Sequence, residues 1–358
     1  MNSSDGIRNK AIELGFDLVG FAPVLPAKHA DAFFQWLDNG LHADMEWLAR
    51  DPLRRTDPKR VLPGAQSMIS VGLSYYVADP PNELWNDPSR GRIARYAWGE
   101  DYHRHLEPKL KDLSAFIRGQ VGARTRYYVD TGPVLERSVA AEAGIGFIGK
   151  NSLLIHPEFG SYLFLGVILT DMELDYDDPA QDGGATLRKA LTGTRTRQGT
   201  CGTCRRCLEI CPTHAFPAPY ILDSNRCISY LTIELKGAVP ERLRPQMKNW
   251  IFGCDECQSV CPWVRRYSQP RKSHFLRLDP DRCAPRLVEL MALDEDGFRN
   301  RFRGTPIARA KRRGLLRNVA VALGNWGDPS AKPALERVLQ DPEPLIREHA
   351  TWALHQLR

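Results

Sequence analysis

The sequence lacks long apolar runs. No stretch of the 358 residues approaches the roughly 18 consecutive apolar residues that a membrane-spanning helix needs. The first residues, Met-Asn-Ser-Ser-Asp-Gly, show no charged segment leading into an apolar core and no twin-arginine leader. We therefore expect a cytoplasmic protein with no membrane partner.

A large excess of one charge is also missing. Lys and Arg number 49 against 43 for Asp and Glu, which gives a net charge of +6. With 42% hydrophobic and 26% charged residues, the composition is that of an ordinary globular protein. A chain of this length has room for two or three domains, each with its own core.

The basic residues are unevenly distributed. One run, without an acidic residue, consists of Arg299, Arg301, Arg303, Arg309, Lys311, Arg312, Arg313 and Arg317. A second consists of Arg265, Arg266, Arg271, Lys272 and Arg277, interleaved with Trp263, Tyr267, His274 and Phe275. Basic groups among flat rings suit a nucleic-acid backbone with splayed bases. A solvated basic face above buried aromatic residues explains the same pattern.

Cysteine is scarce, but its spacing is the strongest signal in the chain. From residue 201 to residue 212 the sequence reads Cys-Gly-Thr-Cys-Arg-Arg-Cys-Leu-Glu-Ile-Cys-Pro, the iron-sulfur spacing of two-cluster bacterial ferredoxins. A second set, Cys227, Cys254, Cys257 and Cys261 before a proline, repeats the pattern with a longer first gap. In such proteins the cysteine before the proline serves the other cluster. The sequence therefore predicts two 4Fe-4S clusters.

The crossover assigns the ligands to two sets. The first cluster would take Cys201, Cys204, Cys207 and Cys261, and the second would take Cys211, Cys227, Cys254 and Cys257. Cys283 remains as an ordinary small apolar residue. Disulfides would need an oxidising compartment, and paired zinc sites usually show two separated Cys-x-x-Cys pairs.

The chain divides into four parts by composition. Residues 1–174 alternate apolar strand patterns with amphipathic helix patterns, which predicts an α/β layered domain. Residues 175–199 contain hardly any apolar residue and suit an exposed linker. Residues 200–286 hold the cysteines, and residues 287–358 contain three short helical segments that resemble a HEAT-type repeat. Because that repeat is too short to be stable alone, it should pack on the cysteine-containing part.

Two features of the first part could carry chemistry. Gly144, Gly146 and Gly149 formally match a dinucleotide fingerprint, but they follow a helix instead of a strand. Close approach of the backbone to a large flat ligand or a simple turn would each explain these glycines. Asp130 ends a predicted strand before a helix predicted from residue 133, so it is either a helix cap or, if buried beside an apolar cofactor, a catalytic acid.

Several motifs together resemble the epoxyqueuosine reductase family. They are Arg-Tyr-Ala-Trp-Gly-Glu-Asp-Tyr-His from residue 95, Val-Asp-Thr-Gly-Pro-Val-Leu-Glu-Arg from residue 129, Gly-Phe-Ile-Gly-Lys-Asn-Ser from residue 146, the two cysteine sets, and the segments that begin at residues 227 and 253. The resemblance spans nearly the whole chain. The linker at residues 175–199 is longer than the family pattern, which leaves the domain boundary open.

The resemblance implies a cobalamin-dependent oxidoreductase of the last step of queuosine biosynthesis. Such an enzyme removes the epoxide oxygen of epoxyqueuosine at the wobble position of tRNAs for Asp, Asn, His and Tyr. It implies an N-terminal cobalamin domain similar to that of reductive dehalogenases, a ferredoxin-like α+β domain with two clusters, and C-terminal helical repeats that contact tRNA. We expect a monomer that takes electrons from a low-potential donor.

The resemblance also implies roles for individual residues. Asp130 would be the proton donor. Candidate cobalamin contacts, besides Asp130, are Arg55, Arg95, Tyr102, His103, Lys150, Asn151, Ser152 and Ser161. No Asp-x-His-x-x-Gly stretch offers a histidine to cobalt, so a base-off corrinoid is expected. We expect electrons to enter at the cluster of Cys211 and Cys227 and to pass to the other cluster and then to cobalt.

Two other functions stay open at this point. A reductive dehalogenase that acts on a small molecule would share the cofactors, but it would have no use for a basic helical platform. A ferredoxin-like electron carrier would explain the cysteines and nothing before residue 170.

Overall fold

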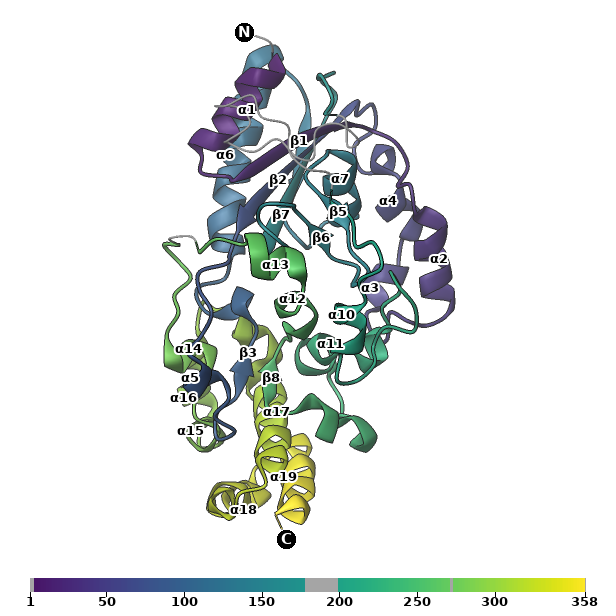
Figure 1. Ribbon diagram of the computed structural model, residues 1–358. Helices are drawn as coiled ribbons and strands as arrows, with labels where there is room; N and C mark the ends of the chain where they lie inside the picture. Colours follow the sequence, from purple (N-terminus) through teal and green to yellow (C-terminus); the bar gives the residue numbers. More distant parts are fainter. Residues whose placement is uncertain (1–2, 178–198, 271–272, 358) are drawn as a thin grey trace.

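A four-stranded antiparallel sheet forms the centre of the first part of the chain (Figure 1). The computed structural model describes residues 3–177, 199–270 and 273–357. The sheet order is β1 (Leu18–Pro23), β2 (Ser67–Ser74), β7 (Leu163–Thr170) and β4 (Thr125–Tyr128). β2 and β7 are central, and nearly all of their residues are buried. Strands and helices alternate as predicted, and every ladder of this sheet is antiparallel.

Helices cover both faces of the sheet. On one face, α1 (Ser3–Glu13) and the long α6 (His103–Val121) share a core with the strands, because the apolar residues of α6 recur at helical spacing. On the other face, α7 (Glu136–Glu142) packs against β2 and β7 through Val139 and Ala143. α7 begins three residues later than the sequence pattern predicts, so residues 130–135 form a loop between β4 and α7.

A lobe of short helices stands beside the sheet. It consists of α2 (Ala30–Asp38), α3 (Glu46–Ala49) and α4 (Pro52–Thr56). Although α2 is rich in aromatic residues, none of its residues is fully buried. The lobe is tied to the cysteine-containing part instead, since the Trp36 indole donates to the carbonyl of Leu222 at 2.6 Å and Tyr230 donates to Asp44 at 2.7 Å.

Short elements surround the cysteines. They are α10 (Arg206–Glu209), α11 (Ile228–Ile233), β8 (Trp250–Phe252), α12 (Glu256–Ser259) and α13 (Pro262–Tyr267). β8 pairs in parallel with β3 (Arg92–Ile93), which follows the short helix α5 (Asn82–Trp85). Two further two-residue strands, β5 (Phe147–Ile148) and β6 (Leu154–Ile155), form a hairpin next to this part.

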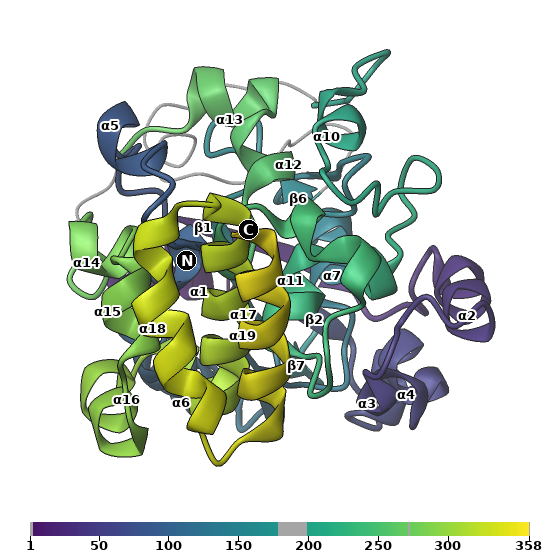
Figure 2. The same cartoon turned by 90° about the horizontal axis from the view of Figure 1, so that it is seen from below.

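The C-terminal part is helical and shares its core with the rest of the chain. It contains α14 (Pro280–Cys283), α15 (Leu287–Met291), α16 (Glu295–Phe302), α17 (Lys311–Trp326), α18 (Lys332–Arg337) and α19 (Pro344–Gln356). α17 packs along α19, and its apolar face joins one core with Trp98 and Ile251. As predicted, the repeat does not stand alone. Figure 2, which is seen from below, shows α17 and α19 side by side in front of the rest of the protein.

The predicted linker lies mostly outside the described residues, since only residues 175–177 and 199 of it are described. Asp177 is anchored to the first domain, because Arg8 binds its carboxylate at 2.9 Å and the backbone N–H of Phe21 donates to it at 2.9 Å. Among the described residues, none of the helices is long and apolar enough to cross a membrane.

Candidate active site

Asp130 stands on the loop between β4 and α7, in a backbone conformation that is unusual for a residue other than glycine. Its φ angle is +59°, which costs about 1 kcal/mol or more and points to a functional position. The hydroxyl of Tyr102 donates a hydrogen bond to Oδ2 of Asp130 at 2.8 Å. The Asp130 side chain keeps 56% of its surface exposed. Its carboxylate is therefore held at one oxygen and accessible at the other.

The alternative role of Asp130 as a helix cap is excluded by the geometry. Leu135 occupies the N-cap position of α7. The backbone N–H of Asp130 instead donates to Oε1 of Glu136 at 2.6 Å. Burial raises the pKa of Glu136 to about 8, and the nearby charge of Asp130 adds to the shift. At neutral pH, Glu136 is therefore a protonated carboxyl that holds the Asp130 loop.

A residue from the C-terminal part reaches the same loop. Nη1 of Arg309 lies 3.8 Å from Oδ2 of Asp130, and its Nη2 lies 3.6 Å from Asp101. Arg309 also lies against His103, with 2.9 Å between Nη2 and Nδ1. Burial opposes ionisation of Asp101, but hydrogen bonds from His103 outweigh it and lower the pKa of Asp101. Arg309 thus bridges two carboxylates at the mouth of the site.

Two further ionisable side chains lie near this loop. Arg137 is exposed, and desolvation lowers its pKa while the charges of Glu136 and Asp130 act in the opposite direction. Tyr96 keeps part of its surface accessible, and desolvation raises its pKa.

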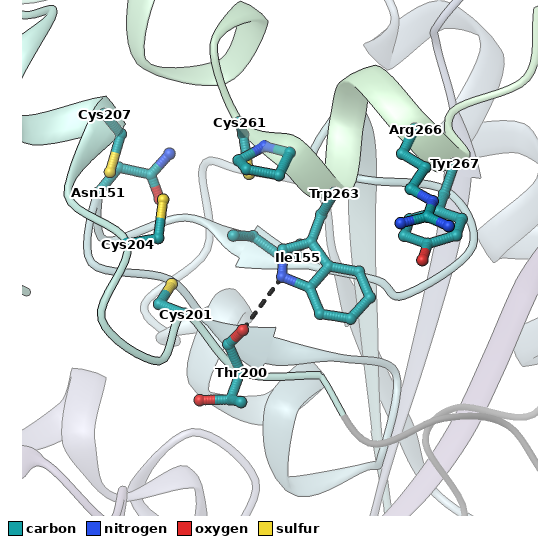
Figure 3. A pocket seen from close by; sticks show the side chains of 11 residues that line it. Asn151, Ile155, Thr200, Cys201, Cys204, Cys207, Cys261, Trp263, Arg266 and Tyr267 are labelled. Atoms are coloured by element: carbon teal, nitrogen blue, oxygen red, sulfur yellow. Dashed lines mark hydrogen bonds between the residues drawn. The ribbon is translucent and has the colours of Figure 1, made fainter.

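The first set of cysteines surrounds one pocket of 280 Å³ (Figure 3). Cys201, Cys204, Cys207 and Cys261 all line it. The backbone N–H of Lys150 points at Sγ of Cys201 at 3.4 Å. The Trp263 indole, which donates to the carbonyl of Thr200 at 3.2 Å, forms another wall.

The cysteines of the second set also come together in space. Cys211, Cys227, Cys254 and Cys257 lie close enough to interact electrostatically. The backbone N–H of Ala215 points at Sγ of Cys211 at 3.3 Å. Gly253 packs so closely on Ala94 that an added Cβ would lie 2.5 Å from the Ala94 Cβ, and 3.5 Å from Tyr96. Tyr96 therefore separates this set from Tyr102 and Asp130.

The spacing of the thiols does not suit a single metal ion. In the described ranges, no group of three or more His, Cys, Asp or Glu residues is close enough to hold one ion. A cubane keeps its four thiolates further apart than a zinc ion does, so the arrangement fits clusters better than zinc. All nine cysteines are free.

The residues from Lys150 to Ser161 connect the two parts of the protein. Lys150 Nζ donates to the carbonyls of Gly202 and Cys204 at 2.7 and 3.0 Å. Asn151 donates to the carbonyl of Cys257 at 3.4 Å, and Ser152 donates to the carbonyl of Tyr220 at 3.0 Å. Ser161 donates to the side-chain oxygen Oε1 of Gln258 at 3.0 Å. These polar groups are engaged with the cysteine loops, which they hold in place, and their contact with cobalamin stays a prediction.

Two predicted arginine contacts also have protein partners. Arg95 is only 5% exposed, and it binds Asp79 at 2.5 Å and stacks on Tyr162. It is a buried structural residue and offers no surface to a cofactor. Arg55 donates to the carbonyl of Gly132 at 3.1 Å, so it stabilises the loop that contains Asp130.

The glycine run approaches protein, not a flat ligand. An added Cβ at Gly146 would lie 2.5 Å from the carbonyl oxygen of Ile155, and one at Gly149 would lie 2.5 Å from the Ile155 side chain. Gly144 follows α7 with a φ of +69°. The turn interpretation therefore holds, and the glycines allow the β5–β6 hairpin to pack tightly.

The basic run near the C-terminus divides into internal and surface residues. Arg312 binds Asp341 in a buried ion pair, and Arg317 donates to the carbonyls of Leu231, Leu235 and Gly237. These two arginines hold the fold together. The less buried members Arg299, Arg303, Lys311 and Arg313 line a pocket of 440 Å³, together with Arg312, Glu295 and Glu343. In the second run, Arg271 and Lys272 lie outside the described residues.

Sequence reasoning missed Glu136, Arg137 and Arg309 as parts of the site. Glu136 and Arg137 stand inside one of the quoted motifs, and that signal could have identified them. Arg309 lies 179 positions after Asp130, and no local pattern connects the two.

Comparison with known proteins gives the following matches. Three family models match: "Epoxyqueuosine reductase QueG, DUF1730" at residues 55–131, "4Fe-4S double cluster binding domain" at residues 200–264, and "HEAT repeats" at residues 306–358. Epoxyqueuosine reductase of Escherichia coli is 40% identical over 354 residues, which cover 98% of this chain and 88% of the relative.

Solved structures agree with these matches. A crystal structure of epoxyqueuosine reductase with a tRNA-Tyr epoxyqueuosine-modified stem loop superposes with a TM-score of 0.87 at 31% identity, covering 99% of this chain and 89% of the other. The Bacillus subtilis enzyme, with its catalytic aspartate loop swung out of the active site, gives 0.86 at 30% identity, covering 99% and 90%.

Proposed function

The chain belongs to the epoxyqueuosine reductase family, and we propose that the site around Asp130 reduces epoxyqueuosine to queuosine at the wobble position of tRNA. The expected substrates are the tRNAs for Asp, Asn, His and Tyr. The observation that carries this proposal is the position of Asp130, held by Tyr102 and Arg309 on a loop near Tyr96, which also lies close to Gly253 beside Cys254 of the second set.

The chemistry assigns a distinct role to each side chain of the loop. Conversion of an epoxide to an alkene consumes two electrons and two protons, and the oxygen leaves as water. Because Tyr102 donates to Oδ2 of Asp130, the proton that Asp130 delivers to the departing oxygen is carried by Oδ1. Glu136 fixes the backbone of the loop, and Arg309 faces the negative charge that remains on Asp130 after proton transfer.

The two cysteine sets would hold two 4Fe-4S clusters. Free thiols in two groups, with the N–H groups of Lys150 and Ala215 directed at sulfur, fit thiolate ligands. The first set surrounds the open pocket, and the second lies beside Tyr96. We therefore infer an electron path that enters at the first set and leaves at the second, opposite to the order expected from the sequence.

Cobalamin would bind next to the Asp130 loop. A bound corrinoid would supply a cobalt atom able to deliver both electrons to one carbon. Arg137 and Tyr96, which lie near Asp130 and keep part of their surface accessible, would contact the polar amide groups of such a ligand. Of the predicted contacts, Tyr102 and His103 lie on this side. Its base-off state and the likeness of this domain to reductive dehalogenases stay predictions.

The tRNA would lie across the C-terminal helices. The pocket lined by Arg299, Arg303, Lys311 and Arg313 offers basic groups to phosphates. α16 also leads directly to Arg309 through the 3₁₀ helix Pro306–Ala310, so the basic surface and the catalytic loop are adjacent. An electron carrier would have no use for this arrangement, and neither would a dehalogenase of small molecules.

The decisive test of this function is nucleoside analysis. A strain that lacks this protein should accumulate epoxyqueuosine in its tRNA, and the gene for the wild-type chain should restore queuosine. Unchanged queuosine in the deletion strain would contradict the proposal.

A further inference from the structure

The pocket at the first cysteine set opens on a basic surface that the reduction of epoxyqueuosine does not itself require. Arg205 and Arg206 precede Cys207 on and next to α10, and both are exposed. Arg265 and Arg266 follow Cys261 on α13, and both are also exposed. Arg266 lines the pocket itself (Figure 3). We call these four arginines the α10–α13 surface.

Apolar groups accompany these charges. Ile210, directly after α10, is 38% exposed. Trp263 and Tyr267 lie against one another with 5.4 Å between ring centres and a tilt of 33°, and both line the pocket beside the thiols. Glu209 faces Arg205 at 3.9 Å and offsets part of the charge. A small apolar centre within a basic rim suits a transient protein contact.

The position of this surface argues against tRNA as its occupant. Figure 2 shows α10 and α13 at one edge of the molecule and α16 near the opposite edge. The basic pocket of α16 belongs to that opposite side. A stem loop that contacts this basic pocket would therefore lie away from the α10–α13 surface.

We propose that the α10–α13 surface docks the electron donor, a small acidic one-electron carrier protein such as a flavodoxin. This inference rests on the proposed function and names the partner that supplies its electrons. Opposite charge speeds the encounter of two proteins and orients them. In each encounter the reduced carrier loses one electron at the first set and leaves oxidised. Two encounters supply the two electrons that one epoxide consumes.

The test uses the reconstituted full-length protein and a purified, acidic flavodoxin as the probe. The double variant Arg206→Glu/Arg266→Glu is compared with Arg242→Glu, an exposed arginine on another surface. Calorimetry measures binding of the oxidised carrier, and stopped-flow spectroscopy measures bleaching of the cluster absorbance by the reduced carrier. Both are repeated at low and high salt.

The proposal predicts at least about tenfold weaker binding and slower bleaching for the double variant at low salt, with the difference shrinking at high salt. Arg242→Glu should behave as wild type. Photoreduced deazariboflavin, a small reductant, should bleach all variants equally, which shows that the clusters are intact. Wild-type behaviour of the double variant towards flavodoxin would overturn the proposal.

Measuring the binding of a tRNA stem loop tests whether tRNA, and not the electron carrier, occupies the α10–α13 surface. The double variant should bind it as wild type does. A loss of stem-loop affinity with unchanged carrier reduction would assign the surface to tRNA and overturn the proposal. Because none of these measurements requires turnover, failure of the docking proposal is distinguishable from failure of the proposed reaction.

Discussion

Arg309 and Asp130 face each other across the boundary between the C-terminal helices and the first domain, with 3.8 Å between Nη1 and Oδ2. The helical part is thus more than a platform for a substrate, because it contributes a charge to the catalytic loop. Tyr102 completes the contact, since its ring lies 5.8 Å from the Arg309 guanidinium and its hydroxyl donates to the same carboxylate oxygen.

Replacement of Asp130 should remove the proton donor and leave the cofactor sites intact. We expect Asp130→Asn to lower turnover by at least about 100-fold, the range for loss of a general acid. The variant should still bind cobalamin and show unchanged cluster absorbance. Single-turnover assays with modified tRNA measure the first effect, and anaerobic spectroscopy measures the second. Retained activity would remove Asp130 from the mechanism.

Tyr102→Phe removes one hydroxyl and keeps the ring, which stacks on Phe164 with 4.4 Å between centres. A hydrogen bond to a charged group contributes about 1.5–3 kcal/mol, so kcat should fall roughly tenfold or more while cobalamin affinity stays unchanged. Tyr128→Phe, on β4 before the loop, is the matched control. Equal kcat values for Tyr102→Phe and wild type would contradict a positioning role.

Glu136 should impose an alkaline limit on activity. Its pKa is raised to about 8, so it is neutral below that pH and becomes a second carboxylate beside Asp130 above it. The raised pKa also means that folding loses stability as pH rises from 4.5, the ordinary value for the unfolded carboxyl, to about 8. Glu136→Gln keeps an oxygen for the Asp130 N–H.

The corresponding measurement is the pH profile of kcat. Wild type should lose activity as pH rises through about 8, and Glu136→Gln should remain active above that pH. The same loss of kcat above pH 8 in wild type and Glu136→Gln would show that a group other than Glu136 titrates in this range.

Arg303, on the basic surface, and Arg309, which contacts Asp130, should respond differently. Arg303→Gln should weaken stem-loop binding and lower the dependence of log K on log salt by about one unit, with kcat at saturating tRNA unchanged. Arg309→Gln should instead lower kcat at saturating tRNA. Binding titrations at several salt concentrations and saturated turnover distinguish them, and the same behaviour for both variants would contradict this division.

Arg317 should act through stability alone. Its guanidinium is 1% exposed and donates to three carbonyls that would be left without it. Removal of one partner from such a buried network costs about 3–5 kcal/mol. Arg317→Ala should lower the apparent denaturation midpoint strongly, whereas Arg313→Ala, half-buried on the same helix, should change it little. Chemical denaturation under anaerobic conditions measures both.

The sequence predicts what depends on local spacing. The alternation of strands and helices in residues 1–174 follows from short patterns, and so do the cysteine sets, the first of which lines one pocket. The partners of Lys150, Asn151 and Ser161 could not be predicted, because they lie about 50 to 110 positions further along the chain.

The errors have the same origin. Basic residues look alike in a sequence, but burial turns Arg95, Arg312 and Arg317 into structural groups. The order of electron transfer through the two cysteine sets, by contrast, stays a prediction, because it depends on how the first domain packs on β8, where Gly253 meets Ala94 and Tyr96. No pattern within either segment specifies that contact.

The most direct test of this account is conversion of epoxyqueuosine in purified tRNA by the reconstituted protein, with and without cobalamin, followed by mass spectrometry of the nucleosides. The account predicts queuosine only when cobalamin and a reductant are both present, and none with Asp130→Asn. Full conversion by protein that contains its clusters but no cobalamin would contradict a corrinoid at the centre of the site.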